Sequence, residues 1–253
     1  METWREDFAN TPPFAHLTRW SEHLGGPDWP ELATLNRAAA QQNLRNAAGL
    51  PVQFTVQSSR YSQHDYEMGI HSTGLVPSRE RNWHDLFNAL TWLAFPQTKA
   101  ALNALHCTTL QHGKNRTPTS DAATLFDESG LVLIGDDATL IQLLIERRWR
   151  EALVDRRADW QQIKAYVFGH AVLEKLLTPW PGITAKCLFV NIPADTALAP
   201  LDTAISEIWR QQKISAPASL FPMPVLGIPG WWPANEMAEF YADERVFRPP
   251  RRI

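Results

Sequence analysis

The chain has few of the residues and segments on which several classes of protein depend. Its 253 residues include only two cysteines, Cys107 and Cys187, which is too few for a disulfide scaffold and gives none of the close pairs of structural zinc sites. No apolar run approaches the length needed to cross a bilayer, and residues 1–7 lack the basic and apolar segments of a secretory signal. We therefore expect a cytoplasmic protein with buried, reduced thiols and no membrane partner.

Positive charge is not in excess either. The formal net charge of -3 argues against a surface built mainly for nucleic acid, because phosphate backbones select strongly positive faces, although a local patch such as residues 245–253 stays open. Hydrophobic content of 44% and charged content of 20% are typical of globular proteins. A chain of this length can bury one sizeable core, so we predict a single domain over residues 1–253.

The spacing of apolar residues predicts a mainly helical α+β fold with a small sheet of about four strands. Strands are expected at 50–57, 66–71, 131–134 and 186–192, and helices at 30–48, 82–95, 97–110, 120–126, 137–154, 158–177 and 199–212. Asn82 is a good N-cap for the helix at 82–95, and Pro96 is expected to end that helix and open the next. Because helices and strands do not alternate regularly, a doubly wound sheet is not favoured.

The composition changes in residues 215–253, where prolines are dense and Trp231-Trp232 stands between Pro229 and Pro233. Prolines this close together disfavour regular elements, so we predict an ordered coat or lid. Trp231 and Trp232 are candidates for binding a substrate by stacking, and packing of the coat against the core is the alternative.

Polar side chains on two apolar helices mark the candidate site. His84, Asp85 and Asn88 lie opposite the apolar face of the helix that begins at Asn82, in a segment with little room for an exposed face. His170 and Glu174 are four residues apart and share one helical face. Just before them, Gly169 permits another backbone to approach closely. We predict that the two polar faces meet in one cleft.

This cleft is the predicted site of a divalent metal. The candidate ligands are His84, His170 and Glu174, with Asp85 or Asp121 completing the set. Zinc, manganese and iron accept imidazole and carboxylate ligands together. The alternative is a structural hydrogen-bond network between the two helices.

The same residues are the candidate catalytic groups. His84, Asp85, Asn88 and Glu174 are assigned to catalysis, with Glu174 or Asp85 as ligand or base for a water activated by the metal. Arg79 and Arg116 are expected to hold a small anionic substrate, because a guanidinium matches carboxylate and phosphate oxygens. Before the strand at 131–134, Asp127 is assigned to an acidic turn, whereas Glu128 stays open as a further catalytic carboxylate.

Two resemblances bear on function. The His84-Asp85 pair resembles the dyad of the helical His-Asp metal phosphohydrolases, which implies phosphoester hydrolysis, but their further histidine and distal aspartate have no counterpart here at a matching spacing. The blocks Asn82-Trp-His-Asp-Leu-Phe-Asn-Ala-Leu and Leu226-Gly-Ile-Pro-Gly-Trp-Trp-Pro233 resemble an uncharacterised proteobacterial family of unknown function, which implies no particular activity. The alternative to an enzyme is a non-catalytic module that binds RNA, a nucleotide or a protein through its tryptophan-rich C-terminal region.

Overall fold

The computed structural model describes residues 2–24, 26–111 and 117–249. The α-helices are α1 Thr18–Leu24, α2 Leu32–Gln41, α3 Gln63–Thr73, α4 Trp83–Ala94, α5 Pro96–Gln111, α6 Pro118–Ser129, α7 Ala138–Ile145, α8 His170–Leu176 and α9 Leu198–Arg210. The strands are β1 Gln53–Val56, β2 Leu75–Ser78, β3 Gly130–Gly135, β4 Lys164–Val167, β5 Thr184–Asn191 and β6 Phe221–Pro224. The predicted mainly helical α+β class is confirmed.

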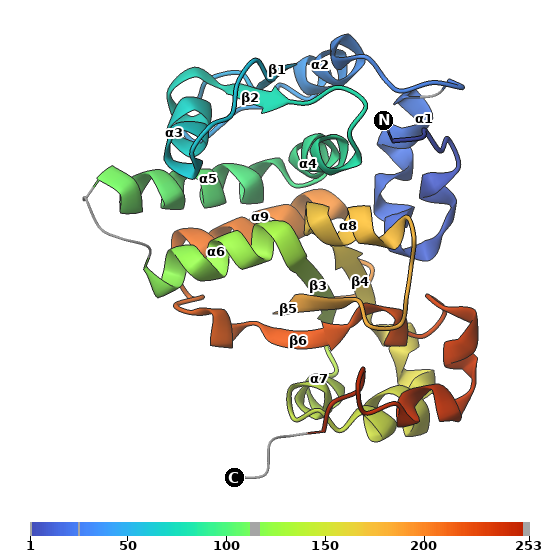
Figure 1. Cartoon of the computed structure of the whole chain (residues 1–253). Coiled ribbons are helices and arrows are strands. Elements are labelled where there is room, and N and C mark those ends of the chain that lie inside the picture. Colours follow the sequence, from blue (N-terminus) through green and yellow to red (C-terminus); the bar gives the residue numbers. More distant parts are fainter. Residues whose placement is uncertain (1, 25, 112–116, 250–253) are drawn as a thin grey trace.

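The elements are stacked in layers (Figure 1). A parallel pair, β1 and β2, lies with α2 and α3 on one side of α4 and α5. Next come α6, α8 and α9, and then a four-stranded sheet, beyond which lie α7 and the C-terminal segment. In the described part of the chain, no helix is both long enough and apolar enough to cross a membrane.

The four-stranded sheet has the order β4-β3-β5-β6. Strand β3 runs parallel to β5 and antiparallel to β4, and β6 closes the sheet antiparallel to β5. Every residue of β3 is buried, because elements cover both faces of the sheet, and this burial explains its uninterrupted apolar sequence. The strands predicted at 131–134 and 186–192 are thus confirmed.

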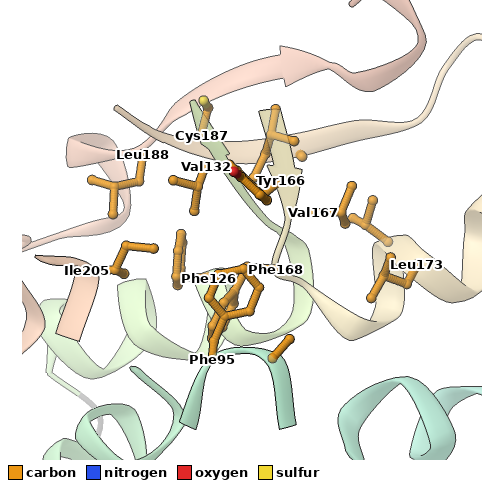
Figure 2. Packing of buried hydrophobic residues seen from close by; sticks show 14 of the residues in the cluster. Phe95, Phe126, Val132, Tyr166, Val167, Phe168, Leu173, Cys187, Leu188 and Ile205 are labelled. Atoms are coloured by element: carbon orange, nitrogen blue, oxygen red, sulfur yellow. The ribbon is translucent and has the colours of Figure 1, made fainter. Parts of the chain in front are cut away.

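Three aromatic side chains join the helices to the sheet (Figure 2). The ring of Phe168, just after β4, lies 4.6 Å from that of Phe126 on α6 and 5.3 Å from that of Phe95 at the end of α4. All three are fully buried, beneath sheet residues such as Val132. This packing fixes α4, α6 and the start of α8 relative to one another, and these are the elements that carry the candidate site.

Two of the expected elements are wrong. Residues 66–71 are not a strand but part of α3, whose first turn is capped by the Ser62 hydroxyl and which ends at Gly74 with a φ of 76°. The partner of β1 is instead β2. The expected helix at 158–177 is divided into a 3-10 helix, strand β4 and helix α8, because residues 164–167 pair with β3 and the last helix begins only after Gly169.

Two further expectations need correction. The helix expected at 137–154 ends at Ile145, and Arg147 follows with a φ of 59°, a left-handed conformation that a regular helix does not contain. The C-terminal region does include a regular element, strand β6, which contains Pro222 and Pro224. A strand at the sheet edge tolerates proline because only one of its sides needs backbone donors.

Asp202 on α9 stabilises the start of α5. Its buried carboxylate accepts hydrogen bonds from the backbone N–H groups of Gln97 and Thr98, at 2.8 and 2.9 Å. These amides belong to the first turn of α5, where no intrahelical acceptor is available and the helix dipole is positive. Asp202 therefore links α9 to the first turn of α5 through these two hydrogen bonds.

We expect Asp202→Ala to lower the free energy of unfolding by about 1–3 kcal/mol, because two buried amides lose their acceptor. Urea denaturation measures the effect. Asp202→Asn keeps one acceptor oxygen and should lose less stability. Equal losses in the two variants would show that the remaining oxygen does not cap the helix.

Candidate active site

A cavity of about 430 Å³ lies where α3, α4, α6 and the start of α8 meet. Its wall is mostly polar, and several elements contribute to it. The lining residues are Gln57, Gln63, Tyr66, Glu67, Pro77, Arg79, His84, Asp85, Asn88, His106, Thr124, Asp127, Glu128 and His170. Of the two polar faces predicted from the sequence, His84, Asp85 and Asn88 of the first and His170 of the second border this cavity.

The side chains of His84 and His170 meet at this cavity. Their Nε2 atoms are 3.1 Å apart, with the ring planes at 80°. The Oε1 atom of Glu128 lies 3.6 Å from Nε2 of His170. Each of the three residues offers one ligand atom, and these atoms lie within 4.8 Å of one another. Two unprotonated ring nitrogens this close repel each other unless a proton or a cation lies between them.

Carboxylates lie at the other nitrogen of each ring. Oε2 of Glu174 is 2.9 Å from Nδ1 of His84, and Oδ2 of Asp127 is 4.0 Å from Nδ1 of His170. The contact with Glu174 favours the proton of His84 on Nδ1, which leaves the lone pair of its Nε2 directed toward the cavity. Nδ1 of His170 is buried without a hydrogen-bond partner among the described residues, so Asp127 acts on this ring through its charge and not through a hydrogen bond.

The charges of Asp127 and Glu128 are stabilised by neighbouring cationic or hydrogen-bonding groups. Desolvation opposes ionisation of both carboxyls, but Lys99 and His170 outweigh it at Asp127, and a hydrogen bond with His170 outweighs it at Glu128. The pKa of each carboxyl consequently lies below its ordinary value. Both residues are carboxylates at neutral pH.

A backbone contact between two glycines brings these groups together. A Cβ on Gly169 would lie 2.4 Å from the backbone nitrogen of Gly130 and 2.5 Å from the carbonyl oxygen of Glu128. The N–H groups of Phe168 and Gly169 both donate to the Gly130 carbonyl, at 2.9 Å. The end of α6 therefore touches the start of α8, which confirms the expected close approach at Gly169 and sets Glu128 beside His170.

Lys99 on α5 is buried behind the cavity wall. Its ammonium donates to Oδ1 of Asp127 at 2.6 Å and to Oδ1 of Asn88 at 2.8 Å. The Asn88 amide nitrogen in turn donates to the Tyr66 hydroxyl at 3.0 Å. A buried cation is thus neutralised by one carboxylate and linked through an amide to a phenol in the cavity wall.

Arg79 and Asp85 form a closed pair. The guanidinium donates through Nε and Nη2 to both carboxylate oxygens, at 2.9 and 2.8 Å, and the Arg79 backbone N–H adds a bond of 2.7 Å. Desolvation opposes ionisation of Asp85, but Arg79 outweighs it, so the pKa of this carboxyl is lowered. The geometry favours a structural role for the pair. The anion-binding role of Arg79 and the catalytic role of Asp85 stay predictions.

The other predicted site residues are dispersed. Glu174 lies behind His84 and, like Asp121 on α6, is not among the described residues that line the cavity. Arg116 lies outside the described residues. Trp231 and Trp232 line a separate cavity of about 440 Å³ together with N-terminal residues. Their predicted role, and the alternative of a binding module in this region, stay predictions.

The sequence did not identify Tyr66, Glu67 and His106 of the cavity wall or Lys99 behind it, and Glu128 was left open. Tyr66 and Glu67 were missed because residues 66–71 were expected to be a strand. The signals of a helix were present, since Ser62 with Asp65 three positions later is a capping pattern and Gly74 is a helix terminator. Lys99 and His106 carry no local signal, because only packing directs them to the cavity.

The chain belongs to the family described as "Protein of unknown function (DUF3025)", whose model matches residues 52–251. The matched region contains every residue of the cavity wall. No curated protein and no solved structure matches the chain. The family description assigns no activity, so function has to be argued from the site.

We expect Gly169→Ala to lower the free energy of unfolding by about 1–3 kcal/mol, because the added methyl group overlaps the backbone of the α6–β3 junction. Urea denaturation measures the loss. Gly69→Ala on α3 is the matched control, since a Cβ there meets no atom within 4 Å; it should be neutral or stabilising by up to about 1 kcal/mol. A neutral Gly169→Ala would contradict the close contact.

Glu67 should make the stability of the fold depend on pH, because the pKa of its carboxyl is raised, mainly by desolvation. A carboxyl with a raised pKa in the folded state stabilises the fold below its ordinary pKa and loses that contribution as the pH rises through the folded value. Glu67→Gln removes this titration and keeps an acceptor for Asn103. The melting temperature of the variant minus that of the wild type should therefore increase between pH 4 and pH 8. A difference that stays constant or falls would show that the pKa is not raised.

Proposed function

We propose that the protein is a metal-dependent hydrolase whose divalent cation is bound by Nε2 of His84, Nε2 of His170 and the carboxylate of Glu128. One observation carries the proposal. Three donor atoms lie within 4.8 Å of one another in a cavity wall, and Nδ1 of His84, opposite its donor atom, contacts the Glu174 carboxylate at 2.9 Å. Carboxylates in that outer position orient metal-binding histidines and strengthen their basicity.

The donor set fits a catalytic cation. Zinc to nitrogen bonds of about 2.0–2.1 Å place tetrahedral ligand atoms about 3.3 Å apart, close to the distances of 3.1 and 3.6 Å between the donor atoms here. Two imidazoles and one carboxylate are the ligands of hydrolytic zinc and of non-haem iron sites. Three protein ligands leave positions for water and substrate. Zinc, manganese and iron are the proposed cations.

The chemistry follows from an open coordination position. The cation lowers the pKa of a bound water and polarises a substrate oxygen, which favours hydrolysis near neutral pH. Glu67 also lines the cavity, and desolvation raises the pKa of its carboxyl, so we propose it as the group that accepts the proton of that water. Glu174 orients His84, and Lys99 neutralises Asp127, whose carboxylate lies 4.0 Å from Nδ1 of His170.

The proposed substrate is a small anionic molecule. The cavity volume of about 430 Å³ limits its size. The cation supplies the positive charge that attracts it, because the charge of Arg79 is already neutralised by Asp85. We place this activity in the cytoplasm, where the two buried cysteines would remain reduced thiols.

Protein purified without chelator should contain close to one equivalent of zinc, manganese or iron by elemental analysis. His84→Ala and His170→Ala should lose the metal, because each removes a ligand atom. Glu174→Gln keeps all three ligands and should weaken binding by about 10–100-fold. Calorimetric titration of the chelator-treated protein with zinc gives these affinities.

His64→Ala is the matched control, since His64 is exposed and does not line the cavity. It should bind zinc like the wild type. The proposal fails if the folded wild type binds none of the three metals, or if His64→Ala and His170→Ala lose affinity equally. Circular dichroism confirms that each variant is folded.

A further inference from the structure

We infer that the Tyr66 hydroxyl donates a hydrogen bond to the substrate, binding one oxygen of a carboxylate or phosphoryl group whose other oxygen is on the cation. This inference rests on the proposed function, and it names the substrate class of that site. It is carried by a chain of hydrogen bonds from Lys99 through Asn88 to Tyr66.

Lys99 fixes which atoms donate and which accept in this series of hydrogen bonds. An ammonium group has hydrogens to donate and no lone pair to accept, so the Asn88 atom that faces Lys99 is the amide oxygen. The Asn88 amide nitrogen therefore faces Tyr66 and donates to its hydroxyl oxygen at 3.0 Å. Because that oxygen accepts from Asn88, the hydroxyl hydrogen is directed elsewhere, and Tyr66 lines the cavity.

The phenol keeps this hydrogen over the physiological pH range. Desolvation, together with the nearby charges of Glu67 and Asp127, raises the pKa of Tyr66 well above its ordinary value. A neutral phenol beside carboxylates is a donor, and it binds a negatively charged oxygen more strongly than a neutral one. The side chain is also held by its bond to Asn88, so its orientation is set before a substrate binds.

The spacing along α4 suits a bridging oxyanion. His84 and Asn88 are four residues apart on one face of α4, so their Cα atoms are separated by about 6 Å along the helix axis. A group with two oxygens could then contact a cation held at His84 through one oxygen and the Tyr66 hydroxyl, bonded to Asn88, through the other. A carboxylate or a phosphoryl group has this form.

Lys99 and Asn88 act through Tyr66 and are positioning residues. The ammonium is shared between Asp127, which faces His170, and Asn88, which faces Tyr66. One buried cation thus orients both the outer carboxylate of the metal site and the donor for the substrate. This arrangement gives Asn88, predicted from sequence as a catalytic residue, a defined role in which it touches no reacting atom.

The test uses full-length protein loaded with cobalt(II), whose visible absorption changes when an anion joins the coordination sphere. Inorganic phosphate and acetate are the two probes, titrated separately. Tyr66→Phe should bind cobalt with unchanged affinity but bind at least one of the anions about tenfold more weakly, because one charge-assisted hydrogen bond is lost. Weaker phosphate binding alone identifies a phosphoryl substrate, and weaker acetate binding alone identifies a carboxylate.

Two further variants complete the experiment. Tyr61→Phe removes the hydroxyl of an exposed tyrosine outside the cavity and should match the wild type. Asn88→Ala keeps the Tyr66 hydroxyl but releases its orientation, so it should weaken anion binding less than Tyr66→Phe and leave cobalt binding unchanged. Anion affinities in Tyr66→Phe equal to those of the wild type, with cobalt bound in both, overturn this inference alone. Failure of the wild type to bind cobalt overturns the proposed function and this inference together.

Discussion

The backbone contact between Gly130 and Gly169 is the constraint on which the candidate site depends. A residue with a side chain at Gly169 would overlap the carbonyl of Glu128 and the nitrogen of Gly130, so the two segments could not lie this close. The contact joins the junction between α6 and β3 to Gly169, the residue that precedes α8. Because Asp127 and Glu128 lie three and two residues before Gly130 and His170 immediately follows Gly169, the backbone contact brings the carboxylates close to the imidazole.

Aromatic packing adds the third helix to this arrangement. Phe126 on α6 and Phe95 at the end of α4 both pack on Phe168, two residues before His170 (Figure 2). Rigid aromatic contacts of this kind define the distance between helices more sharply than aliphatic side chains do. With α4 fixed in this way, His84 faces His170 across 3.1 Å. The apolar core therefore sets the position of the polar side chains, and these side chains then provide hydrogen-bond partners for one another.

Most charged side chains around the cavity lie beside a side chain of opposite charge. Arg79 neutralises Asp85, Lys99 neutralises Asp127, and the Nδ1 side of His84 faces Glu174. Among the described residues of the cavity wall, the Nε2 atoms of the two histidines and the Glu128 carboxylate face one another, and a cation there would balance the charge of Glu128.

The sequence by itself determined the local features of this protein. The Asn82 cap, the helix break at Pro96, the apolar strand at 131–134 and the helical spacing of His170 and Glu174 all follow from interactions within a few residues, so they were predictable. Tertiary structure decided which carboxylate meets the histidines, and it placed Glu128 in the cavity and Glu174 behind His84. It also decided that Arg79 is neutralised and that Lys99 reaches Asn88. These contacts join segments that are distant in the sequence, or side chains whose direction depends on packing, and periodicity carries no information about either.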